Sequence, residues 1–124
     1  MKELDKILDT LKDEMLDTLR EWVRIPSVAT EAAPGAPFGP VVREMLDKAL
    51  ADCEKLGFQT ENFDGFIGHA DMGTGDDEDA LAILAHLDVV PQGDGWTKQP
   101  FGAEVHDGKL YGRGTSDDKG PAVA

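Results

Sequence analysis

Residues 86–117 read HLDVVPQGDGWTKQPFGAEVHDGKLYGRGTSD, and DKGP follows them directly. The stretch begins with a His-x-Asp, His86 and Asp88, and ends on Asp117, the first member of an Asp-Asp pair after a Gly-Arg-Gly turn. Imidazole and carboxylate groups of this kind are the parts of a metal site. Because the chain stops at Ala124, soon after the second part, we expect the site to be incomplete.

The apolar run that leads into His86, ALAILAHL at 80–87, predicts a strand buried on both faces, because it is short, continuous and bounded by turns. Apolar residues spaced by three and four predict helices over 3–24 and 40–56, ended by Pro26 and Gly57 respectively. Further expected elements are strands over 58–63 and 66–72, a polar turn over 73–79, a loop over 91–100, a hairpin of 101–105 and 109–111 joined through 106–108, and a helix that starts near Pro121. This order predicts the α/β class, with a layered sheet.

The composition limits the function. The chain has 12 basic and 25 acidic residues and a formal net charge of −13, which argues against binding to nucleic acid or to an anionic membrane surface. Its sequence has no apolar run long enough to span a bilayer and no signal peptide at the N-terminus. Cys53 is the only cysteine, so no internal disulfide forms. These properties predict a cytoplasmic protein.

His86 and Asp88 are two residues apart, a spacing that suits a metal-binding histidine and an acid that orients its ring. Residues i and i+2 of a strand point to the same face, and open α/β sheets place ligands at the C-terminal ends of their strands. One histidine nitrogen binds zinc while the other commonly donates to a carboxylate. The alternative is a buried histidine that is hydrogen-bonded to backbone, with Asp88 in a turn.

Asp117 and Asp118 follow two glycines, Gly112 and Gly114, which let the backbone pass close to a site. A carboxylate at this point is able to bridge two metal ions about 3.5–4 Å apart. The alternative is an N-cap for the helix that starts near Pro121. One aspartate could be the ligand and the other the cap, and the spacing does not decide which.

Taken together, the motifs of residues 81–124 resemble the metal-site region of the superfamily of zinc-dependent dipeptidases, carboxypeptidase G and succinyl-diaminopimelate desuccinylase. The matching pieces are HLDVVP from His86, GWT from Gly95, QPF from Gln99 and LYGRGTSDDKG from Leu110. GHADMGTGD from Gly68 and WVRIPSV from Trp22 are most similar to the dipeptidase V branch. The resemblance covers nearly the whole chain, but only about the first quarter of such an enzyme.

The resemblance implies a role for three residues. His86 is the expected ligand of one zinc ion, Asp88 the acid that orients its ring, and Asp117 the carboxylate that bridges both zinc ions, while Asp118 has no metal role. The family's general base, from a Glu-Glu pair, and its other ligands would lie beyond Ala124. Residues 1–124 are therefore expected to be the N-terminal part of the catalytic domain, a mixed sheet flanked by helices in the dizinc aminopeptidase-like fold, truncated at the C-terminus.

The implied activity is zinc-dependent hydrolysis of the amide bond of a dipeptide or short peptide. A deacylase of the same superfamily, such as a desuccinylase, and a non-catalytic remnant that needs a complementing chain are the alternatives. We expect the isolated 124-residue chain to lack peptidase activity and to bind zinc weakly. His69 and His106 are expected to be structural or exposed, Trp96 to anchor the loop after Asp88, and Arg113 to have a structural role.

Overall fold

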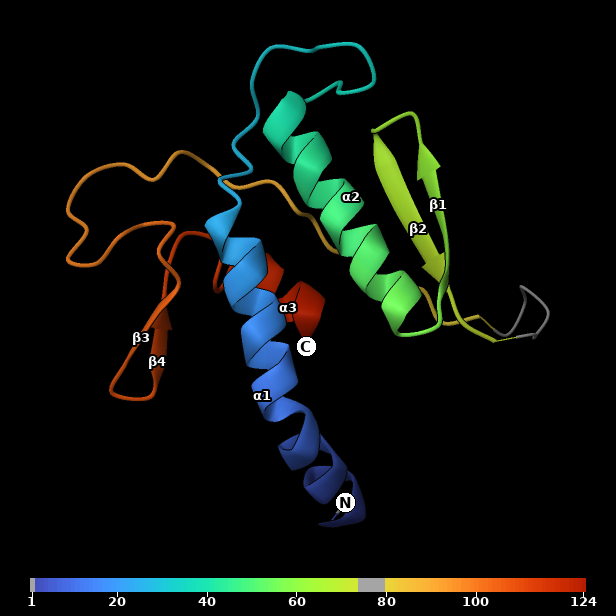
Figure 1. The fold of residues 1–124 in the computed structure, drawn as a ribbon, viewed down its shortest axis with the longest axis vertical. Coiled ribbons are helices and arrows are strands. Elements are labelled where there is room, and N and C mark those ends of the chain that lie inside the picture. The colour runs from blue at the N-terminus through green and yellow to red at the C-terminus, as the bar shows by residue number, and fades with distance from the viewer. Residues whose placement is uncertain (1, 74–79) are drawn as a thin grey trace.

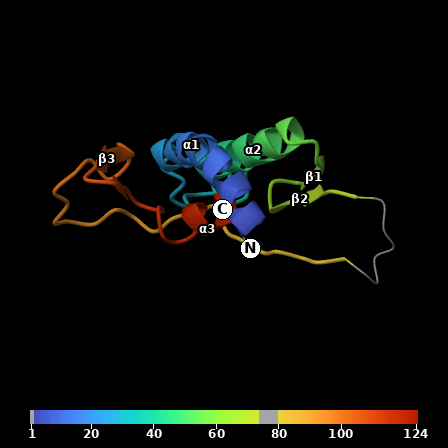
Figure 2. The same cartoon turned by 90° about the horizontal axis from the view of Figure 1, so that it is seen from below.

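A computed structural model describes residues 2–73 and 80–124 (Figure 1). Two long helices lie side by side, and a two-stranded hairpin lies on each side of them (Figures 1 and 2). The α/β class predicted from the sequence is confirmed, although the described strands form two separate antiparallel hairpins. No helix among these residues is long and apolar enough to cross a membrane.

Helix α1, Lys2–Arg24, is the longest element. Its apolar residues recur with helical spacing, Glu3 and Asp5 lie in its first turn, and it ends just before Pro26, as predicted. Only its C-terminal end is buried, through Trp22 and Val23. The stripe Leu4, Ile7, Leu8 and Leu11 is 42–57% exposed. Figure 1 shows this N-terminal half projecting beyond the other elements.

Helix α2, Pro40–Lys55, lies between α1 and the first hairpin. Pro40 occupies its first turn, and Gly57, with φ +93°, follows its C-terminal end. Trp22, Met45 and Ala49 form the core between the helices, and Ile25, Leu87, Ala122 and Val123 pack against it.

Polar groups tie α2 to α1 beside this core. Lys48 Nζ pairs with Glu21 at 2.7 Å and with Asp52 at 2.6 Å, and Trp22 Nε1 donates to Asp52 at 2.9 Å. Burial acts to raise the pKa of Asp52, but hydrogen bonds from Lys48, Lys55 and Trp22 lower it to about 2. Asp52 therefore stays ionised and holds the two helices together at neutral pH.

The first hairpin consists of β1, Gln59–Phe63, and β2, Ile67–Asp71, close to the predicted strands. The second consists of β3, Glu104–His106, and β4, Lys109–Tyr111. His106 pairs with Lys109 and so belongs to the strand instead of the predicted turn, and residues 101–103 precede the strand. The reason is the Asp107-Gly108 pair, whose φ angles of 50° and 71° make a two-residue turn.

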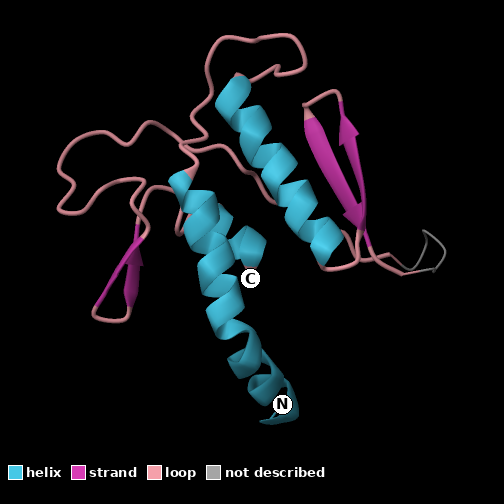
Figure 3. Ribbon diagram, viewed as in Figure 1, coloured by secondary structure: helices cyan, strands magenta, loops and turns pink. Residues whose placement is uncertain are grey.

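The predicted strand over 80–87 is wrong. These residues form a loop (Figure 3), in which Leu81, Ile83 and Leu84 are 86–89% exposed. An apolar run becomes a strand only beside another strand that pairs with its backbone. Among the described residues, 80–88 make no backbone-to-backbone hydrogen bond. The predicted polar turn over 73–79 falls almost wholly on residues 74–79, outside the described residues.

The short helix α3, Lys119–Val123, begins two residues before Pro121 and packs against α1. Asp118 stands at its N-cap position, but its side chain makes no capping hydrogen bond. The alternative in which an aspartate side chain caps this helix is therefore wrong for Asp118. Its carboxylate bonds instead to a distant segment, described below.

Two glycines bring the turn before α3 close to α1 and to the segment after Asp88. A Cβ at Gly112 would lie 2.5 Å from Cγ1 of Val23 in α1. A Cβ at Gly114, where φ is +93°, would lie 2.9 Å from Cγ1 of Val89. Both distances are shorter than ordinary contacts, so the glycines are required for the chain to pass between α1 and residue 89.

We expect Gly114→Ala to lower the free energy of unfolding by about 2–5 kcal/mol, since it adds a clash with Val89 to the strain of a positive φ. Gly95→Ala is the matched control, because Gly95 has φ +85° but nothing within 4 Å of its Cβ position. It should lose only about 1–2 kcal/mol, from backbone strain alone. Urea unfolding followed by circular dichroism measures both, and equal losses would contradict the close approach.

Candidate metal-binding half-site

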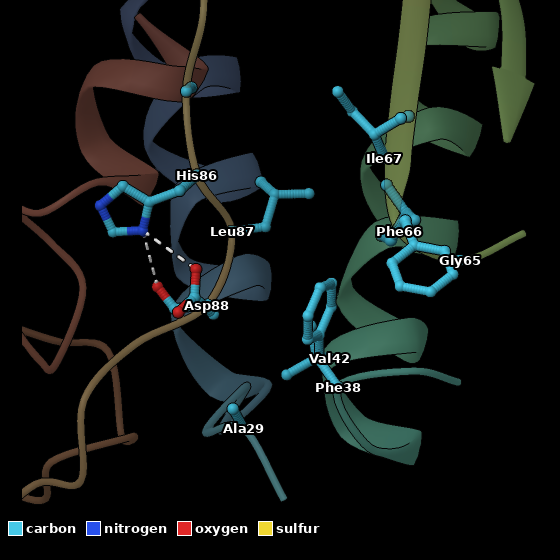
Figure 4. A pocket seen from close by; sticks show the side chains of 12 residues that line it. Ala29, Phe38, Val42, Gly65, Phe66, Ile67, His86, Leu87 and Asp88 are labelled. Carbon is cyan, nitrogen blue, oxygen red and sulfur yellow. Dashed lines mark hydrogen bonds and ion pairs between the residues drawn. The ribbon is translucent and has the colours of Figure 1, made fainter. Parts of the chain in front are cut away.

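The structure brings together the three residues singled out in the sequence. His86 Nε2 lies 2.9 Å from Asp117 Oδ1, and His86 Nδ1 lies 3.3 Å from Asp88 Oδ1. Figure 4 shows the His86 ring turned toward Asp88. All three side chains are accessible, with exposed fractions of 51% for His86, 55% for Asp88 and 87% for Asp117. Segments 31 residues apart in the sequence thus meet at one imidazole.

Asp88 favours one arrangement of the histidine proton. Both the backbone carbonyl and the carboxylate of Asp88 face His86 Nδ1, at 3.1 Å and 3.3 Å. Two acceptors at one nitrogen favour a proton on Nδ1. Nε2 is then the atom available to a metal ion, on the side where Asp117 lies.

Without a metal, a second proton also fits at Nε2. The hydrogen bond with Asp117 raises the pKa of His86, burial acts against it, and the contacts with Asp88 raise it further. The doubly protonated ring then donates to a carboxylate on each side. A proton and a metal ion would therefore compete for the same position between Nε2 and Asp117.

Asp117 and Asp118 contact different parts of His86. Asp117 reaches the ring, whereas Asp118 Oδ2 accepts a hydrogen bond from the His86 backbone N–H at 3.2 Å. Spacing left open which aspartate faces the site, and the geometry places Asp117 there. Asp118 instead joins the backbone of the two segments.

The separation of His86 and Asp117 is close to what zinc needs. Two ligand atoms about 2.0–2.2 Å from a tetrahedral zinc ion are about 3.4 Å apart, and Nε2 and Oδ1 are 2.9 Å apart. A small rotation of the exposed Asp117 side chain would open this space. Among the described residues, however, no three histidine, cysteine or acidic side chains are grouped so that they could hold a metal ion. The residues fit half of a zinc site.

An apolar cavity of about 340 Å³ borders the same segment, between it and the α2–β2 layer. Phe38, Val42, Phe66 and Ile67 line one side and Leu87 lines the other. In Figure 4, Leu87 points toward this space while the His86 ring lies on the opposite side of the chain. His86 and Asp88 also line this cavity, whereas Asp117 does not, so the cavity reaches one of the two metal-binding candidates.

The remaining candidates have structural roles or lie at the surface. Trp96 Nε1 donates to the carbonyl of Gln92 at 2.7 Å, and the Arg113 guanidinium lies over the Trp96 ring, 5.4 Å from its centroid. These contacts fold the loop after Asp88 back on itself, as expected for Trp96. His69 pairs with Asp71 at 3.2 Å, and His106 with Glu104 at 2.8 Å.

Sequence reasoning missed two buried polar residues, Ser27 and Lys119, both 0% exposed. Burial lowers the pKa of Lys119 to about 8. Each follows a motif residue directly, Pro26 in one case and Asp118 in the other, but neither belongs to a periodic pattern. Both residues lie within the quoted motif pieces WVRIPSV and LYGRGTSDDKG, but the sequence does not show that their side chains bond to distant backbone.

Comparison with known proteins finds similarity to one family of peptidases over part of the chain. Residues 82–124 match the profile of Peptidase family M20/M25/M40. The chain is 49% identical over 115 residues to the protein YtjP of Bacillus subtilis (strain 168), whose name assigns it provisionally as a dipeptidase; the match covers 91% of this chain and 24% of that protein. It is 40% identical over 124 residues to the Beta-Ala-Xaa dipeptidase of Lactobacillus delbrueckii subsp. lactis, covering 95% and 25%.

The fold is also similar to a solved structure. The crystal structure of human carnosine dipeptidase 1 superimposes with a TM-score of 0.76 at 30% identity, over 98% of this chain and 28% of that one. The chain thus spans about a quarter of the length of the relatives that it matches. The resemblance predicted from the motifs, to the N-terminal part of this family and its dipeptidases, is confirmed.

We expect the His86 ring of the metal-free chain to titrate above its ordinary value of 6.5, and Asp117→Asn to lower its pKa by removing the largest favourable contact. Because the folded pKa is raised, the pair stabilises the fold below about pH 6.5 and this contribution is lost as the pH rises through the folded pKa. An NMR titration of the ring protons measures the shift. Asp107→Asn, in the distant β3–β4 turn, is the control, and an equal His86 pKa in all three chains would contradict the contact.

Proposed function

From this similarity to the N-terminal part of the M20/M25/M40 peptidases, we propose that the chain supplies half of the two-zinc centre of a dipeptidase. The observation that carries the proposal is one imidazole held between two carboxylates, with Asp88 at Nδ1 and Asp117 at Nε2. His86 is proposed as a ligand of one zinc ion, and Asp117 as the carboxylate that bridges both. Asp88 orients the ring and strengthens it as a ligand.

The protein residues would prepare the site for the ions. Asp88 holds the Nδ1 proton, so that Nε2 presents its lone pair on the side of Asp117. Asp117 offers two carboxylate oxygens, and its side chain lies exposed after the glycine turn. Bound zinc would lower the pKa of a water molecule and polarise the carbonyl of the peptide bond to be cleaved.

The proposed substrate is a dipeptide or short peptide, since the three relatives described above have dipeptidase names. We further propose a cytoplasmic location and no binding to nucleic acid or membranes, on the basis of the net charge of −13. Residues 1–124 are proposed to be the N-terminal part of the catalytic domain. The described residues supply two zinc ligands, whereas each zinc site requires about four.

The isolated 124-residue chain is expected to bind zinc weakly and to hydrolyse no dipeptide, because its described residues bring too few ligands together. Isothermal titration with zinc should give an affinity in the micromolar range or weaker, which His86→Ala reduces further. His69→Ala is the matched control, because His69 also pairs with an aspartate two residues later but faces no second carboxylate among its described contacts. Nanomolar affinity, or turnover that His86→Ala abolishes, would show this expectation to be wrong.

A chimaera tests the activity itself. When this chain replaces the matching quarter of YtjP, the hybrid should hydrolyse dipeptides faster than N-succinyl amino acids. His86→Ala or Asp117→Ala should abolish that activity, and Asp88→Asn should lower it roughly 10–100-fold. His69→Ala should leave it unchanged. A folded hybrid whose activity survives His86→Ala would refute the proposed role, and a preference for N-succinyl substrates would favour a deacylase.

A further inference from the structure

Both halves of the candidate site are attached to one place, the C-terminal end of α1 and the residues just after it. The His86 half is held by Ser27, whose hydroxyl donates to the Leu87 carbonyl at 2.6 Å. The Ser27 carbonyl also accepts a hydrogen bond from the Val89 N–H at 3.0 Å. These two bonds bracket Asp88 and fix the backbone of the segment that presents both His86 and Asp88.

The Asp117 half is held by Lys119. Its ammonium group donates to the Trp22 carbonyl at 2.9 Å and to the Ile25 carbonyl at 2.8 Å. Trp22 lies in the last turn of α1 and Ile25 directly follows the helix, and a cation near the C-terminal end of a helix is favoured by the helix dipole. Lys119 therefore docks the turn that contains Asp117 onto the end of α1.

Stability alone does not account for a lysine at this position. Lys119 is fully buried, and no carboxylate of the described residues lies within ion-pair distance of its ammonium group. A buried charge without an ionic partner is costly, and an apolar side chain of similar volume is commonly as stable or more so. The ammonium group makes two directional hydrogen bonds, which fix the distance and orientation of the turn that contains Asp117 relative to α1.

The relative position of the two segments matters, because packing does not fix the side chains of His86 and Asp117. Asp117 is 87% exposed and His86 is 51% exposed, so packing does not immobilise either side chain. Apart from the His86–Asp117 contact, only the bond from His86 N–H to Asp118 directly links residues 86–89 to residues 117–119 among the described residues. The relative position of the two segments thus depends on their common attachment to α1.

We propose that Ser27 and Lys119 are positioning residues that align the His86 and Asp117 halves of the site on the end of α1. The inference rests on the proposed function, in which the two halves hold a metal ion together. It assigns to two residues without any metal contact the task of setting the separation of the ligands.

The test compares Ser27→Ala and Lys119→Met with Lys48→Met in the 124-residue chain. Lys48→Met is the matched control, because it removes a lysine that also ties α1 to another element, through Glu21 and Asp52, but lies away from the site. Three quantities are measured: the ¹⁵N shifts of the His86 ring without metal, the affinity for Co²⁺ from its visible absorption, and the melting temperature.

Ser27→Ala and Lys119→Met should shift the His86 ring signals and weaken Co²⁺ binding roughly 10–100-fold, as loss of a ligand's supporting contacts does. Lys48→Met should lower the melting temperature and leave the other two quantities unchanged. If Lys119→Met does not fold, Ser27→Ala, the smaller change, decides.

Unchanged ring signals and unchanged Co²⁺ affinity in folded Ser27→Ala and Lys119→Met chains would overturn the proposal and leave both residues a purely structural role. Failure of the proposed function has a different signature, in which the unaltered chain binds no Co²⁺ that depends on His86. The ring signals then decide the positioning role alone, since they require no metal.

Discussion

The C-terminal end of helix α1 and the residues just after it form hydrogen bonds with segments that are far away in the sequence, and the structure depends on these bonds. Lys119 reaches the Trp22 and Ile25 carbonyls across 97 and 94 residues, and Ser27 reaches Leu87 across 60. The Trp22 and Ile25 carbonyls also accept backbone hydrogen bonds from Ile25 and Ser27, so the Lys119 ammonium adds a second donor to each. The buried residues Trp22 and Val23 of the same turn supply the apolar contacts that keep water away from these bonds.

Local patterns predicted the elements that depend on local physics. Helical spacing and Pro26 predicted α1, and the hairpin of β3 and β4 was predicted with its turn one residue too long, because each of these depends on neighbours in sequence. The prediction of a strand over 80–87 was wrong because a strand depends on partners that are distant in the sequence. An apolar run becomes a buried strand only when other elements cover it and a neighbouring strand pairs with it. Among the described residues, no strand pairs with this run. Composition alone could not reveal that.

The candidate site divides in the same way. His86, Asp88 and Asp117 were predicted from their chemistry and from a family resemblance that spacing alone would not have justified. The choice of Asp117 over Asp118 came from that resemblance, and the structure places Asp117 at the ring and Asp118 at the backbone. Ser27 and Lys119 lie within the quoted motif pieces, but their roles were missed, because a buried hydrogen bond to a carbonyl requires no particular partner residue that the sequence could reveal.

The chain contains the His-x-Asp pattern twice, and the comparison shows where specificity arises. His69 and Asp71 lie on the exposed face of β2 and pair at 3.2 Å, much as His86 and Asp88 do at 3.3 Å. The difference is the second carboxylate, which the glycine turn and the attachment of Lys119 bring within 2.9 Å of His86. A tripeptide orients one ring, whereas a metal site needs ligands from separate segments. The long-range contacts at the end of α1, more than the tripeptide, therefore distinguish a candidate ligand from a surface histidine.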